Sequence, residues 1–104
     1  MNQPAATLDT PILDITLDQF RDTMLARGYD EVVERHWDGG TVLDTHTHPF
    51  EANALVVQGE MFLTLGGTAE RRLVAGDRFQ VQPGTPHSER YGDAGATYWV
   101  ARKN

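Results

Sequence analysis

The stretch "HTHPFEANALVVQGEMFLTLGG", residues 46–67, places two histidines one residue apart, in front of a long apolar run. Alternate side chains of a strand point to the same face, so His46 and His48 are expected to face together. Residues i and i+2 lie about 7 Å apart along a strand, and two imidazoles can close that distance by converging on one ion. His87, the last residue of the turn stretch "QPGTPH", is the expected third ligand, brought in by another wall of the fold.

Turn residues punctuate the chain on both sides of that stretch. Runs rich in β-branched and aromatic residues alternate with glycine, proline and aspartate pairs that suit chain reversals. The strand-like runs cover residues 29–37, 41–48, 54–67, 71–84 and 96–102, and the turn signals lie at 38–40, 66–67, 76–77, 83–84 and 92–93. Turns spaced roughly eight to twelve residues apart are typical of a β-sandwich or barrel, so we expect an all-β fold.

One helical segment precedes the strands. "TLDQFRDTMLARG", residues 16–28, repeats its apolar side chains with the period of an amphipathic helix. Thr16 and Gln19 form a capping-box pattern, and Gly28 is a typical stop signal. The apolar stripe comprises Leu17, Phe20, Met24 and Leu25. We expect a short helix over about residues 16–27, packed against a barrel over about residues 29–102.

Length and composition set limits on function. A chain of 104 residues suits one core, so we assign residues 1–104 to a single domain. The formal net charge of −6 disfavours nucleic acid and anionic membranes as partners. With no cysteine, the chain has neither a disulfide framework nor a thiolate zinc site. The N-terminal sequence lacks the pattern of a secretion signal, and no segment approaches the length of a membrane span, so we expect a soluble, cytoplasmic protein.

The histidine and glycine pattern resembles the cupin superfamily. The first cupin motif, G-x5-H-x-H-x3,4-E-x6-G, is matched by Gly40, His46, His48 and Gly59. The second motif, G-x5-P-x-G-x2-H-x3-N, is matched by Gly76, Gly84 and His87. The resemblance implies a small double-stranded β-helix, a jelly-roll-like barrel that is usually a homodimer. It also implies a divalent metal ion, held inside one end of the barrel by His46, His48 and His87.

Three departures from the motifs bear on this site. The glutamate ligand of the first motif is replaced by Ala52, which cannot bind a metal. Gln82 replaces the proline of the second motif and Tyr91 its asparagine, and both changes concern loop shape and pocket lining more than ligation. Glu51, beside the missing glutamate, would face the opposite wall of an unbroken strand, although a bend in the chain would let it reach the ion.

The expected donor set is therefore three neutral imidazoles. They would leave a divalent ion with a formal charge of about +2, compared with about +1 when one carboxylate is also bound. Such a site favours anionic or chelating oxygen ligands. Imidazole donors alone do not distinguish iron, zinc, nickel, manganese or copper.

Strand alternation predicts the walls around the ion. Ala54 and Val56 extend the inward row of their strand, which gives small apolar walls suited to a small organic ligand or substrate. The face of His87 also includes Glu89 and Tyr91. These two side chains would orient a substrate or support a ligand histidine.

The sequence leaves two classes of function open. The first is an enzyme, a metal-dependent dioxygenase or a related lyase or isomerase on a small oxygen-rich compound, because the cupins with all-histidine sites include iron dioxygenases. The second is a non-catalytic module that binds or senses a small ligand. No side chain is marked as catalytic, since Ser88 faces away from the adjacent His87, and no motif indicates an organic cofactor. His36 is expected at the surface or at an interface.

Overall fold

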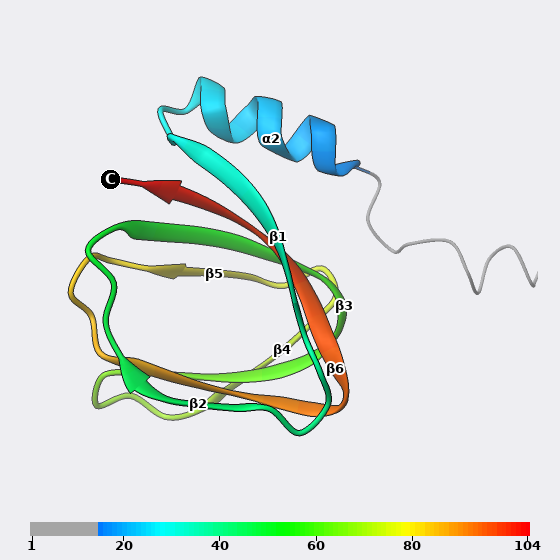
Figure 1. Cartoon of the computed structure of the whole chain (residues 1–104), viewed down its shortest axis with the longest axis vertical. Coiled ribbons are helices and arrows are strands. Elements are labelled where there is room, and N and C mark those ends of the chain that lie inside the picture. Colours follow the sequence, from blue (N-terminus) through cyan, green and yellow to red (C-terminus); the bar gives the residue numbers. More distant parts are fainter. Residues whose placement is uncertain (1–14) are drawn as a thin grey trace, which may run out of the picture.

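The computed structural model describes residues 15–104, which form a rolled antiparallel β-structure with one helix packed outside it (Figure 1). The elements in chain order are α2 (Leu17–Ala26), β1 (Glu31–Trp37), β2 (Val42–His46), β3 (Glu51–Leu65), β4 (Arg71–Val74), β5 (Arg78–Val81) and β6 (His87–Lys103). The expected all-β fold preceded by a short helix is confirmed. Within the described residues, no helix has the length and apolar character needed to span a bilayer.

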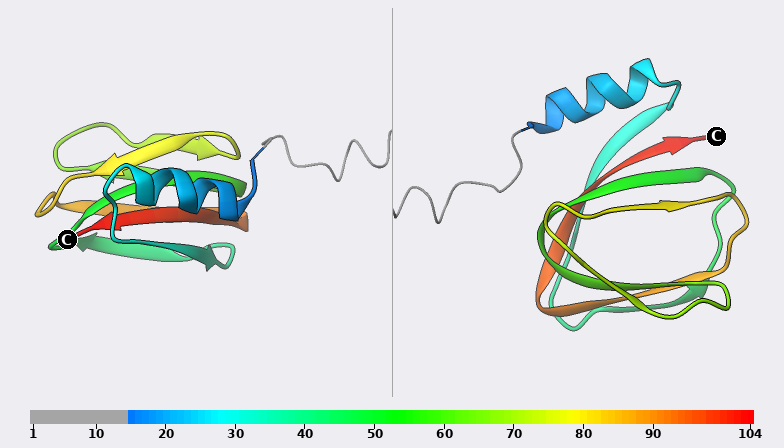
Figure 2. Two further views of the ribbon diagram at one scale, coloured as in Figure 1. Left: turned by 90° about the horizontal axis from the view of Figure 1, so that it is seen from above. Right: turned by 180° about the vertical axis from the view of Figure 1, so that it is seen from behind.

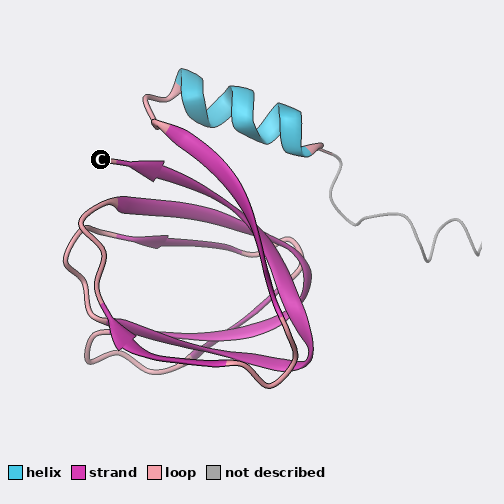
Figure 3. Cartoon of the chain, viewed as in Figure 1, coloured by secondary structure: helices cyan, strands magenta, loops and turns pink. Residues whose placement is uncertain are grey.

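Two long strands, β3 and β6, run through the whole fold (Figure 3). They pair with each other in antiparallel register from Glu51↔Lys103 to Leu65↔His87. The sheet order is β1-β6-β3-β4, with β2 also paired to β6 and β5 also paired to β3. The first residues of β6 pair with β2 and its last residues with β1. The start of β6 therefore lies beside β2 at one end of the roll, and this pairing assembles the site described below.

Glycine residues allow the two long strands to bend together. The β3–β6 ladder has two register shifts between Val56 and Met61. Gly59 and Gly95 have positive φ values of 82° and 73°, and a Cβ atom on Gly59 would lie 2.1 Å from the Gly95 carbonyl oxygen. Only glycine fits such a position without strain. The turn expected at residues 92–93 is wrong, because β6 runs unbroken through them.

The apolar side chains form two clusters, one inside the roll and one under the helix. The inner cluster includes Ala52, Ala54, Val56, Met61, Leu63, Leu73, Phe79, Tyr91, Tyr98 and Val100. The outer cluster joins Phe20 and Met24 of α2 to Leu55 and Trp99 of the sheet. Both views in Figure 2 show α2 on the outside of the roll. Full burial of a methionine or phenylalanine contributes about 1.5–3 kcal/mol, so these two side chains hold the helix in place.

The ends of α2 follow the capping pattern in the sequence. The Thr16 hydroxyl accepts a hydrogen bond from the Gln19 amide at 3.1 Å, and the Gln19 side chain accepts one from the Thr16 amide at 2.8 Å. Gly28, with a φ of 96°, follows the last turn. The prediction that Leu25 belongs to the buried stripe is wrong, because its side chain is 43% exposed.

Candidate metal centre

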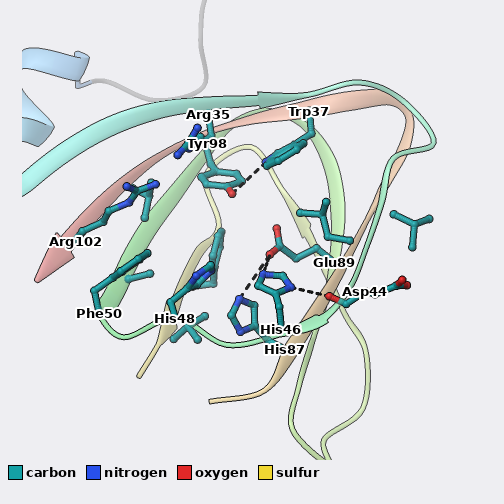
Figure 4. Close-up of a pocket in the computed structure, with 16 residues that line it drawn as sticks. Arg35, Trp37, Asp44, His46, His48, Phe50, His87, Glu89, Tyr98 and Arg102 are labelled. Atoms are coloured by element: carbon teal, nitrogen blue, oxygen red, sulfur yellow. Dashed lines mark hydrogen bonds and ion pairs between the residues drawn. The ribbon is translucent and has the colours of Figure 1, made fainter. Parts of the chain in front are cut away.

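Three of the four histidines of the chain gather at the end of the roll where β2 meets β6 (Figure 4). The ring centroids of His46, His48 and His87 lie between 4.2 and 5.0 Å apart. One ring nitrogen from each histidine lies within 4.8 Å of the other two. The structure thus brings together the three residues that the motif pattern selects, and it positions them to bind one metal ion.

Strand pairing and one turn position these rings. His46 and His87 are direct cross-strand partners in the β2–β6 ladder, and side chains in such pairs lie on the same face of a sheet. β2 ends at His46, so His48 lies beyond the strand, in the connection to β3, and not within the strand as the sequence predicts. The amide of Gly84 donates to the carbonyl oxygen of His48 at 2.8 Å, which ties this connection to the turn that precedes His87.

Backbone carbonyl groups set the orientation of two rings. Nδ1 of His46 lies 2.6 Å from the carbonyl oxygen of Asp44, and Nδ1 of His87 lies 2.9 Å from that of Thr85. A carbonyl oxygen only accepts, so Nδ1 carries the proton in both rings and Nε2 presents its lone pair. The ring of His48 is stacked on Phe50 instead, with centroids 4.7 Å apart and an interplanar angle of 13°.

The surroundings also favour neutral imidazoles. Burial lowers the pKa of His48, and the nearby His87, His46 and Arg102 lower it further. Metal binding requires the neutral form of histidine, so a lowered pKa reduces the competition from protons near neutral pH. Three imidazole nitrogens suit borderline divalent ions such as zinc and iron, so the residues present fit a bound metal.

A buried carboxyl group, Glu89, stands beside the histidines. Its Oε2 lies 3.6 Å from Nε2 of His46 and 3.8 Å from Nε2 of His87, and its side chain is 7% exposed. The Tyr91 hydroxyl donates to Oε1 at 2.5 Å. Alternation along β6 predicts the shared face of these residues and a supporting role for Glu89 beside a ligand histidine, and its carboxylate does lie beside two of the three rings.

The other candidates named from the sequence lie elsewhere. The carboxylate of Glu51 accepts from the Tyr29 hydroxyl at 2.5 Å and from the Gln80 amide at 2.7 Å, away from the histidine cluster. His36 is 57% exposed on its side chain and bonds to the Thr97 hydroxyl at 2.9 Å. His36 is therefore at the surface, as expected, and neither residue joins the candidate metal centre.

The three histidines open into a pocket of about 490 Å³. Its apolar wall includes Trp37, Leu43, Phe50, Ala52, Phe79, Val81 and Val100, and its polar wall includes Arg35, Asp44, Glu89, Tyr98 and Arg102. The size suits a small organic ligand. Ala52 lines this pocket, whereas Ala54 and Val56, the predicted walls, are fully buried core residues that lie outside its lining.

Comparison with known proteins identifies the family. A sequence profile of the cupin domain matches residues 33–100, which is more than half of the chain and includes all three histidines. The protein is a cupin. No curated protein matches this cupin.

Solved structures extend the comparison. The DMSP lyase DddQ from Ruegeria pomeroyi DSS-3 is 26% identical, with a TM-score of 0.67 over 71% of this chain and 38% of that chain. KdgF from Halomonas sp. is 27% identical, with a TM-score of 0.63 over 69% of this chain and 66% of that one. A variant of the Bacillus subtilis oxalate decarboxylase, 18% identical, shares the fold with a TM-score of 0.66 over 86% of this chain and 24% of that chain. This cupin thus spans two thirds or less of each of these three structures.

Proposed function

We propose that this cupin is a metal-dependent enzyme acting on a small oxygen-rich anion, with a divalent ion held by His46, His48 and His87. The observation that carries the proposal is the convergence of the three rings inside a pocket of about 490 Å³. Two of the three rings present fixed Nε2 lone pairs, and burial lowers the pKa of the third. When bound, the ion would polarise a substrate oxygen or, if redox-active, support oxygen chemistry.

Two arginines on the pocket wall support an anionic substrate. Arg35 and Arg102 both line the pocket, and the guanidinium of Arg102 lies 5.0 Å from the centre of the Phe50 ring. Among the described residues, Nε of Arg102 is the one buried side-chain polar atom without a hydrogen-bond partner. A charged guanidinium on the pocket wall would form charge-assisted hydrogen bonds to a carboxylate of the substrate.

A tyrosine supplies a neutral donor on the same wall. The Tyr98 hydroxyl accepts a hydrogen bond from the Trp37 indole at 3.2 Å. Burial, and then the charge of Glu89, raises the pKa of Tyr98. The hydroxyl therefore keeps its proton at neutral pH and is available to donate to a substrate oxygen.

Two reaction classes fit this pocket. The three-histidine donor set resembles that of cupin dioxygenases, whereas the similarity to a protein named as a DMSP lyase, at 26% identity, supports a lyase. The protein purified without chelators should be analysed for metal and then assayed on a panel of diketones, thiols, catechols and small carboxylates, in air and without oxygen. Turnover that stops without oxygen supports the dioxygenase, and turnover in both conditions supports the lyase. A metal-loaded protein that binds an anion and converts no compound would contradict the enzyme and support the non-catalytic ligand-binding module.

The role of the arginine is tested separately. Arg102→Met keeps the apolar stem and removes the charge, and it should raise the KM for an anionic substrate roughly 10- to 100-fold, the equivalent of a lost charged hydrogen bond. Arg90 is the matched control, since its guanidinium also lies over a phenylalanine ring, at 3.8 Å, but outside the metal pocket. Arg90→Met should leave KM unchanged.

We also propose that this cupin is a homodimer, as its family resemblance implies, and that it acts in the cytoplasm. Light scattering coupled to gel filtration measures the assembly, and fractionation of cells locates the protein. A monomer at micromolar concentration would contradict the homodimer. Recovery of the protein outside the cytoplasm would contradict the proposed location.

A further inference from the structure

We infer that Glu89 is a fourth protein ligand of the metal, and that it replaces the carboxylate which the first cupin motif would place at position 52. The inference rests on the proposed function, because it takes the three histidines as ligands. It adds a residue from β6 to a site whose motif carboxylate would come from β3.

The spacing of the donor atoms supports the inference. Donors bound to one ion by bonds of about 2.0–2.1 Å lie roughly 2.9–3.4 Å apart, with the shorter spacing where the ion expands beyond four ligands to accept a substrate oxygen. Oε2 of Glu89 lies 3.6 and 3.8 Å from the Nε2 atoms of His46 and His87. Shifts of between a few tenths of an ångström and about 1 Å would therefore bring the carboxylate and both nitrogens to one ion, and the ring of His48, whose donor lies within 4.8 Å of the other two histidines, would move in with them.

The hydrogen-bond roles of these atoms point the same way. Carbonyl groups hold the protons of His46 and His87 on Nδ1, so both Nε2 atoms are acceptors. The carboxylate of Glu89 is also an acceptor, and the Tyr91 hydroxyl reaches only its Oε1. Three acceptors thus converge in a mostly buried space. A cation at that point satisfies all three, and burying them without one is costly.

Tyr91 acts as a positioning residue for this carboxylate. Burial, together with the neighbouring Tyr98 and Glu89, raises the pKa of the Tyr91 hydroxyl, which therefore remains a donor. Its hydrogen bond fixes Oε1 and leaves Oε2 directed at the histidines. Such partners orient metal ligands in many sites.

A carboxylate ligand at position 89 in place of position 52 affects the charge of the metal centre and the space beside it. With Glu89 bound, three imidazoles and one carboxylate leave a divalent ion with a formal charge of about +1. The side of the pocket at Ala52 is then lined by a methyl group where the motif would place a ligand. That side becomes available to the substrate.

Metal affinity of the full chain tests the inference directly. Zn²⁺ dissociation constants are measured by chelator competition for the wild type, for Glu89→Gln and for the control Glu51→Gln. Glu51 is a matched control because its carboxylate also accepts from a tyrosine hydroxyl but lies away from the histidines. Glu89→Gln should weaken binding at least about tenfold, since loss of even an outer partner costs 10- to 100-fold. Glu51→Gln should bind as tightly as the wild type.

The absorption spectrum of Co²⁺ gives a second readout. Replacing a carboxylate oxygen in the donor set should shift the visible bands in Glu89→Gln, whereas a purely structural glutamate would change the melting temperature of the metal-free protein and leave the bands in place. If Glu89→Gln does not fold, Glu89→Asp withdraws the carboxylate by one methylene and should likewise weaken Zn²⁺ binding.

The outcomes separate the two proposals. Equal Zn²⁺ affinity and equal Co²⁺ spectra in the wild type and the folded Glu89 variant would overturn the role of Glu89 and leave the three-histidine site standing. A wild type that binds neither ion would overturn both.

Discussion

Replacement of His48 by alanine should abolish most of the stabilisation that a metal confers. His48 is the best of the three histidines to remove, because it is half-buried and stacks on Phe50, whereas His87 is 3% exposed and its loss would leave a cavity. An aromatic pair contributes about 0.5–1.5 kcal/mol beyond its buried area, so metal-free His48→Ala should melt about 2–12 °C below the wild type.

The size of the metal effect follows from linkage. An ion present at 100 times its dissociation constant stabilises the folded state by about 2.7 kcal/mol. For a domain of 60–100 residues each kcal/mol corresponds to roughly 4–8 °C, so the wild type should gain about 10–20 °C. Loss of an outer partner of a ligand costs up to about 100-fold in affinity, and loss of a ligand itself should cost at least that. At the same ion concentration the variant then keeps about 0.4 kcal/mol, or roughly 2–3 °C.

Differential scanning fluorimetry with and without Zn²⁺ measures these shifts. His36→Ala is the matched control, because His36 lies at the surface and outside the cluster, and it should keep the full shift. A His48→Ala protein that gains as much as the wild type, or a His36→Ala protein that gains nothing, would refute the assignment of the site.

Three further predictions concern the fold around the site. Gly59→Ala should lower the free energy of unfolding, measured with urea, more than Gly40→Ala does. Both glycines have a positive φ, which costs alanine about 1–2 kcal/mol, but only at Gly59 would the new Cβ lie 2.1 Å from a carbonyl oxygen. Equal losses in the two variants would argue against this close approach. Met24→Ala should lose about 2–5 kcal/mol on thermal unfolding and leave Zn²⁺ affinity unchanged, so weaker binding would show that the helix affects the site. The hydrogen bond from Tyr29 holds the pKa of Glu51 below its usual value. The ionised Glu51 therefore contributes fully to folding stability above about pH 4.3, and this contribution is lost as the pH falls through the lowered pKa. Glu51→Gln should therefore flatten the acid side of the stability curve, and an unchanged curve would contradict this.

Periodicity and turn residues predict most of the fold because they report local preferences. The capping box at Thr16 and the strand-rich runs are such local signals, and the structure confirms them. The turn predicted at residues 92–93 fails because an irregular strand uses the same residue types as a reversal: these residues lie in the register shift of β6 between the pairs Met61↔Tyr91 and Gly59↔Ala96. Leu25 fails because an apolar stripe does not reveal how much of it the sheet covers.

The spacing of the sequence motifs predicts part of the candidate metal centre. Spacing selects His46, His48 and His87, and the structure brings them together. Alternation places Glu89 on the same face as His87, but its contact with His46 depends on the β2–β6 register, which includes a bulge between Leu43 and His46. No local pattern in the sequence encodes such a register.

The arginines of the pocket are also beyond local prediction. Arg35 lies near the end of β1 and Arg102 near the end of β6, and they share one wall because these two strands pair in a register that places both side chains on the same face. Their role as an anion site stays a prediction until substrates are known.

The carbonyl groups that orient two of the rings belong to the main chain, and this has a consequence for how the centre can change over time. Substitutions at Asp44 or Thr85 alter side chains but not the acceptors that His46 and His87 use. The side chains at those two positions can change while the lone pairs of the rings keep their direction. His48 is oriented by the side chain of Phe50, which a substitution can replace. Selection for a different ion or reaction would therefore change the geometry of the centre most easily through position 50.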